Sequence, residues 1–201
     1  MVFERQDFDV FNAKSLDERM AKIRTIIDPK FVELSDKLLA ILNHNDQSWF
    51  AHVAKHLRRT TNAPDNTWVA LAPNKRGYKM LPHYEIGLWE DHVYFYLAVE
   101  ENMKPSQTAD IVSRLRKASD LIAILPKQFV LSTDHMVNRN ELLTPTNYDQ
   151  AVTRFEQVKH SEVLIGIVID KQKYQDDAYD DEQVILTAFE QLHDIYKVLA
   201  H

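Results

Sequence analysis

The sequence predicts an α+β protein in which one mostly antiparallel or mixed sheet of about five strands packs with about five helices. Three observations predict this class. Apolar residues recur at helical spacing near both ends of the chain, several β-rich runs follow one another in the middle, and no repeat or low-complexity linker interrupts them. The 201 residues are therefore expected to form one domain that spans residues 1–201.

Two helices are expected before residue 45. Ser15 and Glu18 have the spacing of a capping box, in which each side chain hydrogen-bonds the backbone of the other. Asp28 and Pro29 are expected to start a second helix, with Asp28 as the N-cap and proline at the first helical position. The apolar stripes are Leu16, Met20, Ile23 and Ile27 in the first helix and Phe31, Leu34, Leu38 and Leu42 in the second.

Four β-rich runs fill the middle of the chain, at residues 49–57, 67–72, 84–89 and 92–99. The last two are expected to form an antiparallel hairpin. If its turn has two residues, Gly87 lies opposite Tyr94 and Glu85 lies opposite Tyr96.

Helices and strands alternate in the remainder of the chain. Pro105 is expected to begin a helix that ends before Pro126, and acidic residues after 175 are expected to open the final helix. Between them the sequence predicts a short strand at 129–132, a helix at 148–158 and a buried strand at 162–170.

Composition excludes several classes of protein. The chain has no cysteine, and its longest apolar stretches are far shorter than the roughly 20 residues that a membrane helix needs. With only three glycines, it contains neither the dinucleotide-binding nor the P-loop phosphate motif. We expect a cytoplasmic protein with no membrane partner, and no motif indicates a cofactor.

One region is basic although the net charge of the chain is −6. Residues 49–84 contain six Lys or Arg and a single acid, Asp65. Arginine presents a rigid fork of donors that fits phosphate or carboxylate, so this region is a candidate anion site. The alternative is a solvated surface that balances acidic helices elsewhere. The candidate contacts are His56, Arg58, Arg59, Lys75, Arg76, Lys79 and His83.

One face of the expected hairpin is unusually polar and aromatic. It could form the floor of a pocket in which Glu85 or a histidine acts as acid or base. The alternative, which we favour, is a half-exposed antiparallel sheet with polar residues outward. The candidate pocket residues are Glu85, Trp89, His92, Tyr94 and Tyr96.

The sequence predicts no metal site. His52 and His56 would lie about 13 Å apart on a strand, too far for one ion. Ser132 to His135 contains catalytic residue types but is more typical of a turn. Glu190 and His193 have the spacing of half a di-iron motif, and no second copy accompanies them.

Three stretches, at residues 49–60, 64–70 and 74–83, together resemble the YktB-like family of uncharacterised bacterial proteins. They begin with Trp49-Phe50-Ala51-His52, Pro64-Asp65-Asn66 and Asn74-Lys75-Arg76-Gly77. The resemblance covers nearly the whole chain. It implies one compact α+β domain in a bacterial cytoplasm, and it implies no activity, cofactor or catalytic residue.

Three functions therefore stay open. The first is a binding module for an anionic ligand, either a nucleotide, a phosphorylated metabolite or a short nucleic acid. The second is a small hydrolase or transferase that uses Glu85 and a neighbouring histidine. The third is a module that docks a protein partner or self-associates. The oligomeric state is not predicted.

Overall fold

The computed structural model describes residues 1–45, 48–104, 106–176 and 178–201. The strands are β1 (Phe50–Val53), β2 (Asn66–Ala72), β3 (His83–Trp89), β4 (His92–Val99), β5 (Val130–Ser132), β6 (Glu141–Leu142) and β7 (Val163–Asp170). The α-helices are α1 (Leu16–Lys22), α2 (Asp28–Leu42), α3 (Thr108–Lys117), α4 (Ser119–Ala123), α5 (Pro145–Gln157) and α6 (Asp181–Ala200). Shorter helical turns are η1 (Arg5–Asn12), η2 (Ile23–Ile27), η3 (Asn43–Asn45), η4 (Glu101–Met103) and η5 (Lys171–Gln175).

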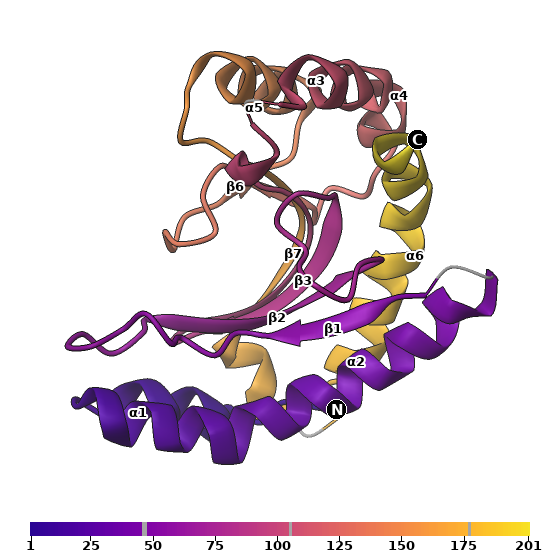
Figure 1. The fold of residues 1–201 in the computed structure, drawn as a ribbon. Coiled ribbons are helices and arrows are strands. Elements are labelled where there is room, and N and C mark those ends of the chain that lie inside the picture. The colour runs from indigo at the N-terminus through magenta and orange to yellow at the C-terminus, as the bar shows by residue number, and fades with distance from the viewer. Residues whose placement is uncertain (46–47, 105, 177) are drawn as a thin grey trace.

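The strands form one antiparallel sheet in the order β1-β2-β3-β4-β7-β5-β6 (Figure 1). The α+β class is confirmed, but about five strands was too few, because the described residues contain seven. The expected hairpin register is also confirmed, since Gly87 pairs with Tyr94 and Glu85 with Tyr96. The first strand ends at Val53 rather than residue 57, and the two-residue β6 was not predicted.

The first two expected helices run into each other. A π-helical turn, η2, joins α1 to α2, and Asp28 has helical dihedral angles of −56° and −39° instead of capping a new helix. The prediction of a break at Asp28 is therefore wrong. Pro29 has no N–H to donate to the preceding turn, and the wider π-turn accommodates it without ending the helix. Ser15 does cap α1, accepting from the Glu18 amide at 3.2 Å.

Apart from β6, the C-terminal half follows the expected alternation, and the main difference is in its first helix. The helix expected from Pro105 begins at Thr108 and is divided at Ala118 into α3 and α4, while Pro105 lies outside the described residues. The final helix begins at Asp181, where the Asp180 side chain accepts from the Gln183 amide.

The sheet has two different sides. The outer side carries the main apolar core, formed with α2, α3, α5 and α6, and the helices lie around this side in Figure 1. The inner side carries a smaller cluster that includes Trp68, Trp89, Tyr94 and Tyr96. Among the described residues, loops rather than helices cover the inner side. Binding residues are often carried by loops on a rigid scaffold, so we expect a site on this side.

Both central hairpin strands are buried along their whole length. The expected half-exposed polar face is therefore wrong, because the loops over the inner side exclude water from it. No helix in the described parts of the chain is long and apolar enough to cross a membrane.

Candidate functional site

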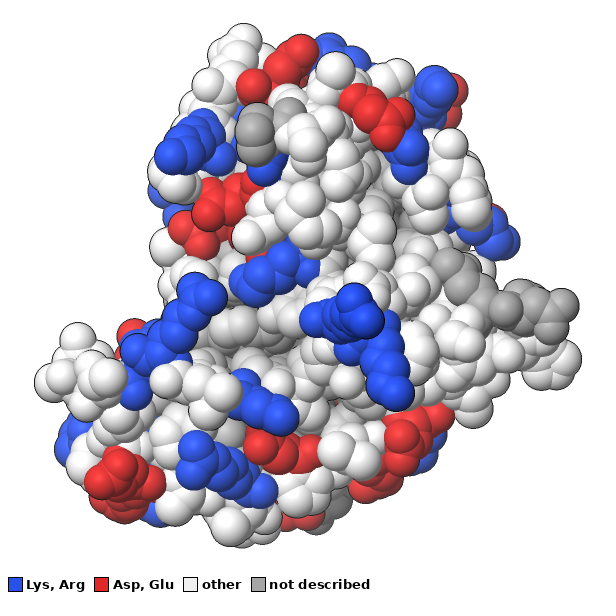
Figure 2. All heavy atoms as spheres, in the orientation of Figure 1, with Lys and Arg blue, Asp and Glu red and all other residues white. Residues whose placement is uncertain are grey.

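A cavity of about 990 Å³ opens on the inner side of the sheet, and we call it the basic hollow. Figure 2 shows Lys and Arg side chains gathered around a depression on this face. The basic side chains that line it come from two loops, the one after β1 and the one between β2 and β3. They are Lys55, Arg58, Arg59, Arg76 and Lys79. The two basic segments of the sequence therefore converge in space.

Hydrogen bonds hold the loop between β2 and β3 in place. His52 Nε2 lies 2.9 Å from the Asn74 carbonyl oxygen, and the Tyr78 hydroxyl accepts from Trp68 Nε1 at 3.0 Å. The Asn74 side chain also accepts from the Arg76 amide. These contacts fix the wall that carries Arg76 and Lys79.

The loop after β1 is fixed by a tight turn at His56. His56 is the one described non-glycine residue with a positive φ, at 50°. Its ring packs edge-on against Trp68 and its Nε2 lies 3.2 Å from the Thr67 hydroxyl. Arg59 then donates to the carbonyls of residues 62 and 63, which closes the turn.

The other candidate anion contacts differ in position and charge. Lys75 is exposed on the same loop as Arg76 but does not line the basic hollow. His83 is fully buried beneath the hollow. His56 lines it, but burial, together with the charges of Arg59 and Arg24, lowers the pKa of its imidazole to about 4. His56 is therefore neutral at pH 7 and adds no positive charge to the hollow.

Three buried side chains, which we call the buried triad, lie below the hollow: His83, Glu85 and Glu100. His83 and Glu85 project inward from β3, and Glu100 directly follows β4. His83 Nε2 is 3.9 Å from Glu85 Oε2 and 3.6 Å from Glu100 Oε1. All three residues have zero exposed fraction.

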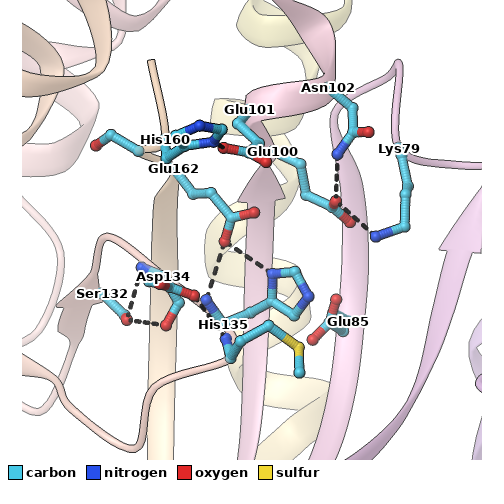
Figure 3. Close-up of polar contacts among 12 residues, drawn as sticks. Lys79, Glu85, Glu100, Glu101, Asn102, Ser132, Asp134, His135, His160 and Glu162 are labelled. Atoms are coloured by element: carbon cyan, nitrogen blue, oxygen red, sulfur yellow. Dashed lines mark hydrogen bonds and ion pairs between the residues drawn. The ribbon is translucent and has the colours of Figure 1, made fainter. Parts of the chain in front are cut away.

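The second carboxylate oxygen of each glutamate has donors of its own. Glu85 Oε1 accepts from the Tyr94 hydroxyl at 2.5 Å. Glu100 Oε2 accepts from Lys79 Nζ at 3.0 Å and from Asn102 Nδ2 at 3.1 Å (Figure 3). Lys79 and Asn102, which also line the basic hollow, therefore link it to the buried triad.

The two glutamates of the triad titrate differently. Burial raises the pKa of Glu100 above its usual range, against the opposing charges of His83, His135 and Lys79. Burial also acts to raise the pKa of Glu85, but the neighbouring His83 and His135 and the Tyr94 hydrogen bond outweigh it and lower the value. Glu85 therefore gives up its proton at a lower pH than Glu100.

An ion pair stands beside the triad. Both the backbone N–H and the Nδ1 of His135 contact Glu162 Oε2, at 2.9 and 2.8 Å. Burial lowers the pKa of His135, but the hydrogen bond to Glu162 and the charges of Glu85, Glu162 and Glu100 raise it to about 9. Figure 3 shows the ring of His135 between Glu162 on one side and Glu85 and Glu100 on the other.

A smaller cavity of about 330 Å³ reaches these groups. Its lining includes Glu100, His135 and Glu162, and it shares Lys79 and Asn102 with the basic hollow. A ligand in the hollow would thus lie next to buried carboxylates and imidazoles, which are groups able to bind a cation or to transfer protons.

The candidate pocket face is divided between two places. Tyr94 and Tyr96 stack at 4.7 Å beside Glu85 on the inner side. His92 lies at the far end of β4, where it contacts Asp91 at 2.7 Å, and Trp89 packs against its ring. The structure therefore places Glu85 with His83 and His135, and not with His92.

Sequence reasoning missed Glu100 and Glu162 and discounted His135. Val99, the last residue of β4, pairs with Val163, the first residue of β7. Glu100 and Glu162, the residues just outside these two strands, therefore meet at the same end of the sheet. Ser132, the last residue of β5, pairs with Leu164, so the loop that carries His135 lies at this end of the sheet too. The only local signal was a glutamate directly after one buried strand, β4, and another directly before the next long buried strand, β7.

Known proteins resemble this chain over almost its full length. Residues 3–196 match the family described as "Domain of unknown function (DUF1054)". A "UPF0637 protein" of Leuconostoc citreum is 56% identical over 199 residues, which is 99% of this chain and 100% of the relative. Another, from Lactiplantibacillus plantarum, is 39% identical over 198 residues, or 98% of this chain and 94% of the relative. A third, from Bacillus cereus, is 38% identical over 187 residues and covers 91% and 88%.

Proposed function

Since the chain belongs to the DUF1054 family, described as a domain of unknown function, we propose a function from the site itself: the protein binds a phosphate-bearing ligand in the basic hollow. The ligand is a nucleotide, a phosphorylated metabolite or the backbone of a short nucleic acid, which share the same anionic group. We place this activity in the cytoplasm, as the cysteine-free composition predicts.

The observation that carries the proposal is a set of unpaired cations around one cavity. Among the described residues, no carboxylate lies within ion-pair distance of Lys55, Arg58 or Arg76, although all three line the hollow. Unpaired cations on two facing loops create a positive potential that attracts and orients an anion. A solvated surface would not need two loops held in place by side-chain hydrogen bonds.

The walls add support for a ligand larger than a free phosphate. The volume of about 990 Å³ lies at the upper end of the range of ligand pockets. Tyr78 contributes aromatic surface to the lining, and such surface can stack on a nucleobase.

A thermal-shift titration of the full chain tests the proposal. The panel consists of pyrophosphate, nucleoside mono- and triphosphates, a sugar phosphate, and short RNA and DNA at two salt concentrations. A ligand at 100 times its dissociation constant adds about 2.7 kcal/mol, which raises the midpoint by roughly 5–10 °C at this chain length. The arms of the panel distinguish small phosphates from nucleic acid.

The variants make the result specific. Arg58→Ala combined with Arg76→Ala should abolish the shift while leaving the unliganded midpoint within about 1 °C, since both side chains are exposed. Lys117→Ala with Lys127→Ala removes the same charge from exposed positions outside the lining and should leave the shift intact. No shift with any anion, or an equal loss in both double variants, would reject the proposal.

A second candidate function is hydrolysis or group transfer on the bound ligand. It is favoured by one observation: the cavity that holds Glu100 and His135 shares lining residues with the hollow. Glu100 and His135 line that cavity, whereas Glu85, the acid or base expected from the sequence, does not. Phosphate release from p-nitrophenyl phosphate would test it, with loss expected in Glu100→Gln and not in Glu90→Gln, which lies outside both cavities.

The third hypothesis, association through an aromatic sheet face, has less support. Trp68, Trp89, Tyr94 and Tyr96 are all buried within the chain, at 8% exposure or less. A partner could not reach these rings without displacing the loops that cover them.

A further inference from the structure

The buried triad contains three polar atoms that face one another without a hydrogen-bond donor. His83 Nε2, Glu85 Oε2 and Glu100 Oε1 each lack a partner in the described structure, and each is inaccessible to solvent. Buried polar atoms are almost always paired, because an unpaired one costs about 1–3 kcal/mol. Three such atoms within 4.8 Å of one another therefore need a common explanation.

The contacts of His83 define what its free nitrogen can do. Its Nδ1 lies 2.8 Å from the carbonyl oxygen of Leu81, which can only accept a hydrogen bond. Nδ1 therefore carries the proton, and in the neutral ring Nε2 is a lone pair. This lone pair faces two carboxylate oxygens, so the centre of the triad is surrounded by acceptors.

The other polar atoms of the triad are held in place. Tyr94 fixes Glu85 through Oε1, while Lys79 and Asn102 fix Glu100 through Oε2. An imidazole that donates its one N–H to a carbonyl and keeps its other nitrogen free, next to carboxylates with hydrogen bonds of their own, is the usual arrangement around metal ligands. The three free atoms are thus preorganised as ligands.

The spacing also fits a small cation. Metal–ligand distances of about 2.1 Å place tetrahedral ligands about 3.4 Å apart. The distances from His83 Nε2, 3.6 Å to Glu100 and 3.9 Å to Glu85, need to contract by only a few tenths of an ångström. We propose that His83, Glu85 and Glu100 bind one divalent first-row transition-metal cation per chain.

The ligand set indicates which cations fit. One imidazole and two carboxylates, with no sulfur, suit Mn²⁺, Fe²⁺ or Zn²⁺. Three protein ligands leave at least one coordination position open for water or another ligand. Glu100 lines the smaller cavity, which provides the route by which the cation and that additional ligand enter.

A neighbouring set, Glu100, His135 and Glu162, also has ligand atoms within 4.8 Å. It differs because Glu162 Oε2 already accepts from both the backbone and the ring of His135. His135 Nδ1 and Glu162 Oε2 therefore already have partners, and of these two described sets only the triad has three buried, unpaired atoms for a cation to bind. The expected stoichiometry is one cation per chain.

The test uses the full chain, stripped with EDTA and titrated separately with Mn²⁺ and Zn²⁺. Calorimetry should give about one equivalent, and saturating metal should raise the thermal midpoint by roughly 5–10 °C. Glu85→Gln should lose both effects. Its metal-free midpoint should not fall, because the new amide can donate to His83 Nε2. Glu90→Gln, at an exposed position outside both cavities, should bind like the wild type.

Two outcomes would overturn the proposal. The first is no binding by the stripped wild type, which would mean that a proton, held on Glu100 or on His83 Nε2, occupies the centre instead. The second is normal binding in Glu85→Gln, or loss of binding only in Glu162→Gln, which would place the ion beside His135. The site does not depend on anion binding, and Arg58→Ala with Arg76→Ala should leave metal affinity unchanged within about twofold.

Discussion

The hydroxyl of Tyr94 reaches Glu85 by crossing over Gly87. Tyr94 and Gly87 are opposite each other in the β3–β4 register, and the hydroxyl donates to Glu85 Oε1 at 2.5 Å. A Cβ at position 87 would lie 2.0 Å from Cζ of the Tyr94 ring. The absence of a side chain at Gly87 is therefore what allows the ring to hold the carboxylate.

Gly87→Ala should displace the Tyr94 ring. The methyl group would overlap the ring in a buried sheet face, so we expect a loss of about 2 kcal/mol in the free energy of unfolding, measured by urea denaturation. Gly77→Ala is the control, since nothing lies within 4 Å of a Cβ at that position. Equal stability of the two variants would show that Tyr94 can move without cost.

Tyr94→Phe should destabilise the protein by about 2 kcal/mol, because it removes the donor to a buried carboxylate oxygen. Tyr96→Phe is the matched control on the same strand face, since no hydrogen bond from its hydroxyl is present in the described structure. We expect a change below about 0.5 kcal/mol for that control. Urea denaturation of both variants at pH 7 measures the difference.

His56 should make stability fall in mild acid. Its pKa is lowered from 6.5 to about 4 in the folded protein, so the unfolded chain takes up a proton first as the pH falls. This contribution is fully present above pH 6.5 and is lost as the pH falls toward 4. Because the ring is only partly buried, we expect a loss of about 1 kcal/mol.

The comparison that isolates His56 is His56→Asn, because asparagine tolerates a positive φ and does not titrate. The difference in the free energy of unfolding between pH 7 and pH 4.5 should be smaller in this variant. An NMR titration should show the His56 ring neutral at pH 5.5. A ring that is already protonated at pH 6 would contradict the burial described here.

Asp181 should be one of the costliest single residues to remove. Its carboxylate is fully buried at the start of α6 and accepts from the amides of Val2 and Phe3 at 2.7 and 2.8 Å. Asp181→Ala leaves both amides unpaired, so we expect a loss of about 3 kcal/mol. Asp194→Ala on the same helix, which breaks only an exposed pair with Lys197, should cost less than about 0.5 kcal/mol.

Much of the fold follows from local patterns in the sequence. Alternation and the position of the turn fixed the pairing of Gly87 with Tyr94, and the capping box at Ser15 placed the first helix. The features that were missed lack a local pattern. Strand β6 has only two residues, too few to show a period, and no local pattern marks the π-turn at η2, through which the helix continues into Asp28 and Pro29.

The site was only partly predictable for a similar reason. The basic residues lie in one continuous stretch of the chain, so composition alone identified Arg58 and Arg76 as candidates. The buried triad depends on Glu100, and its neighbours His135 and Glu162 come from distant segments. Only the pairing of β7 with both β4 and β5 brings them together. That strand order is a property of the whole fold and not of any segment.

Lys79 gives the two proposed ligands a common control point. Its ammonium group lines the hollow and lies 3.0 Å from Glu100 Oε2. An anion that draws Lys79 toward itself would remove the positive charge beside Glu100 and so make its carboxylate a stronger ligand for a cation. By thermodynamic reciprocity, the cation would then strengthen anion binding by the same factor. The protein would act as a coincidence detector, which responds most strongly when both ligands are present.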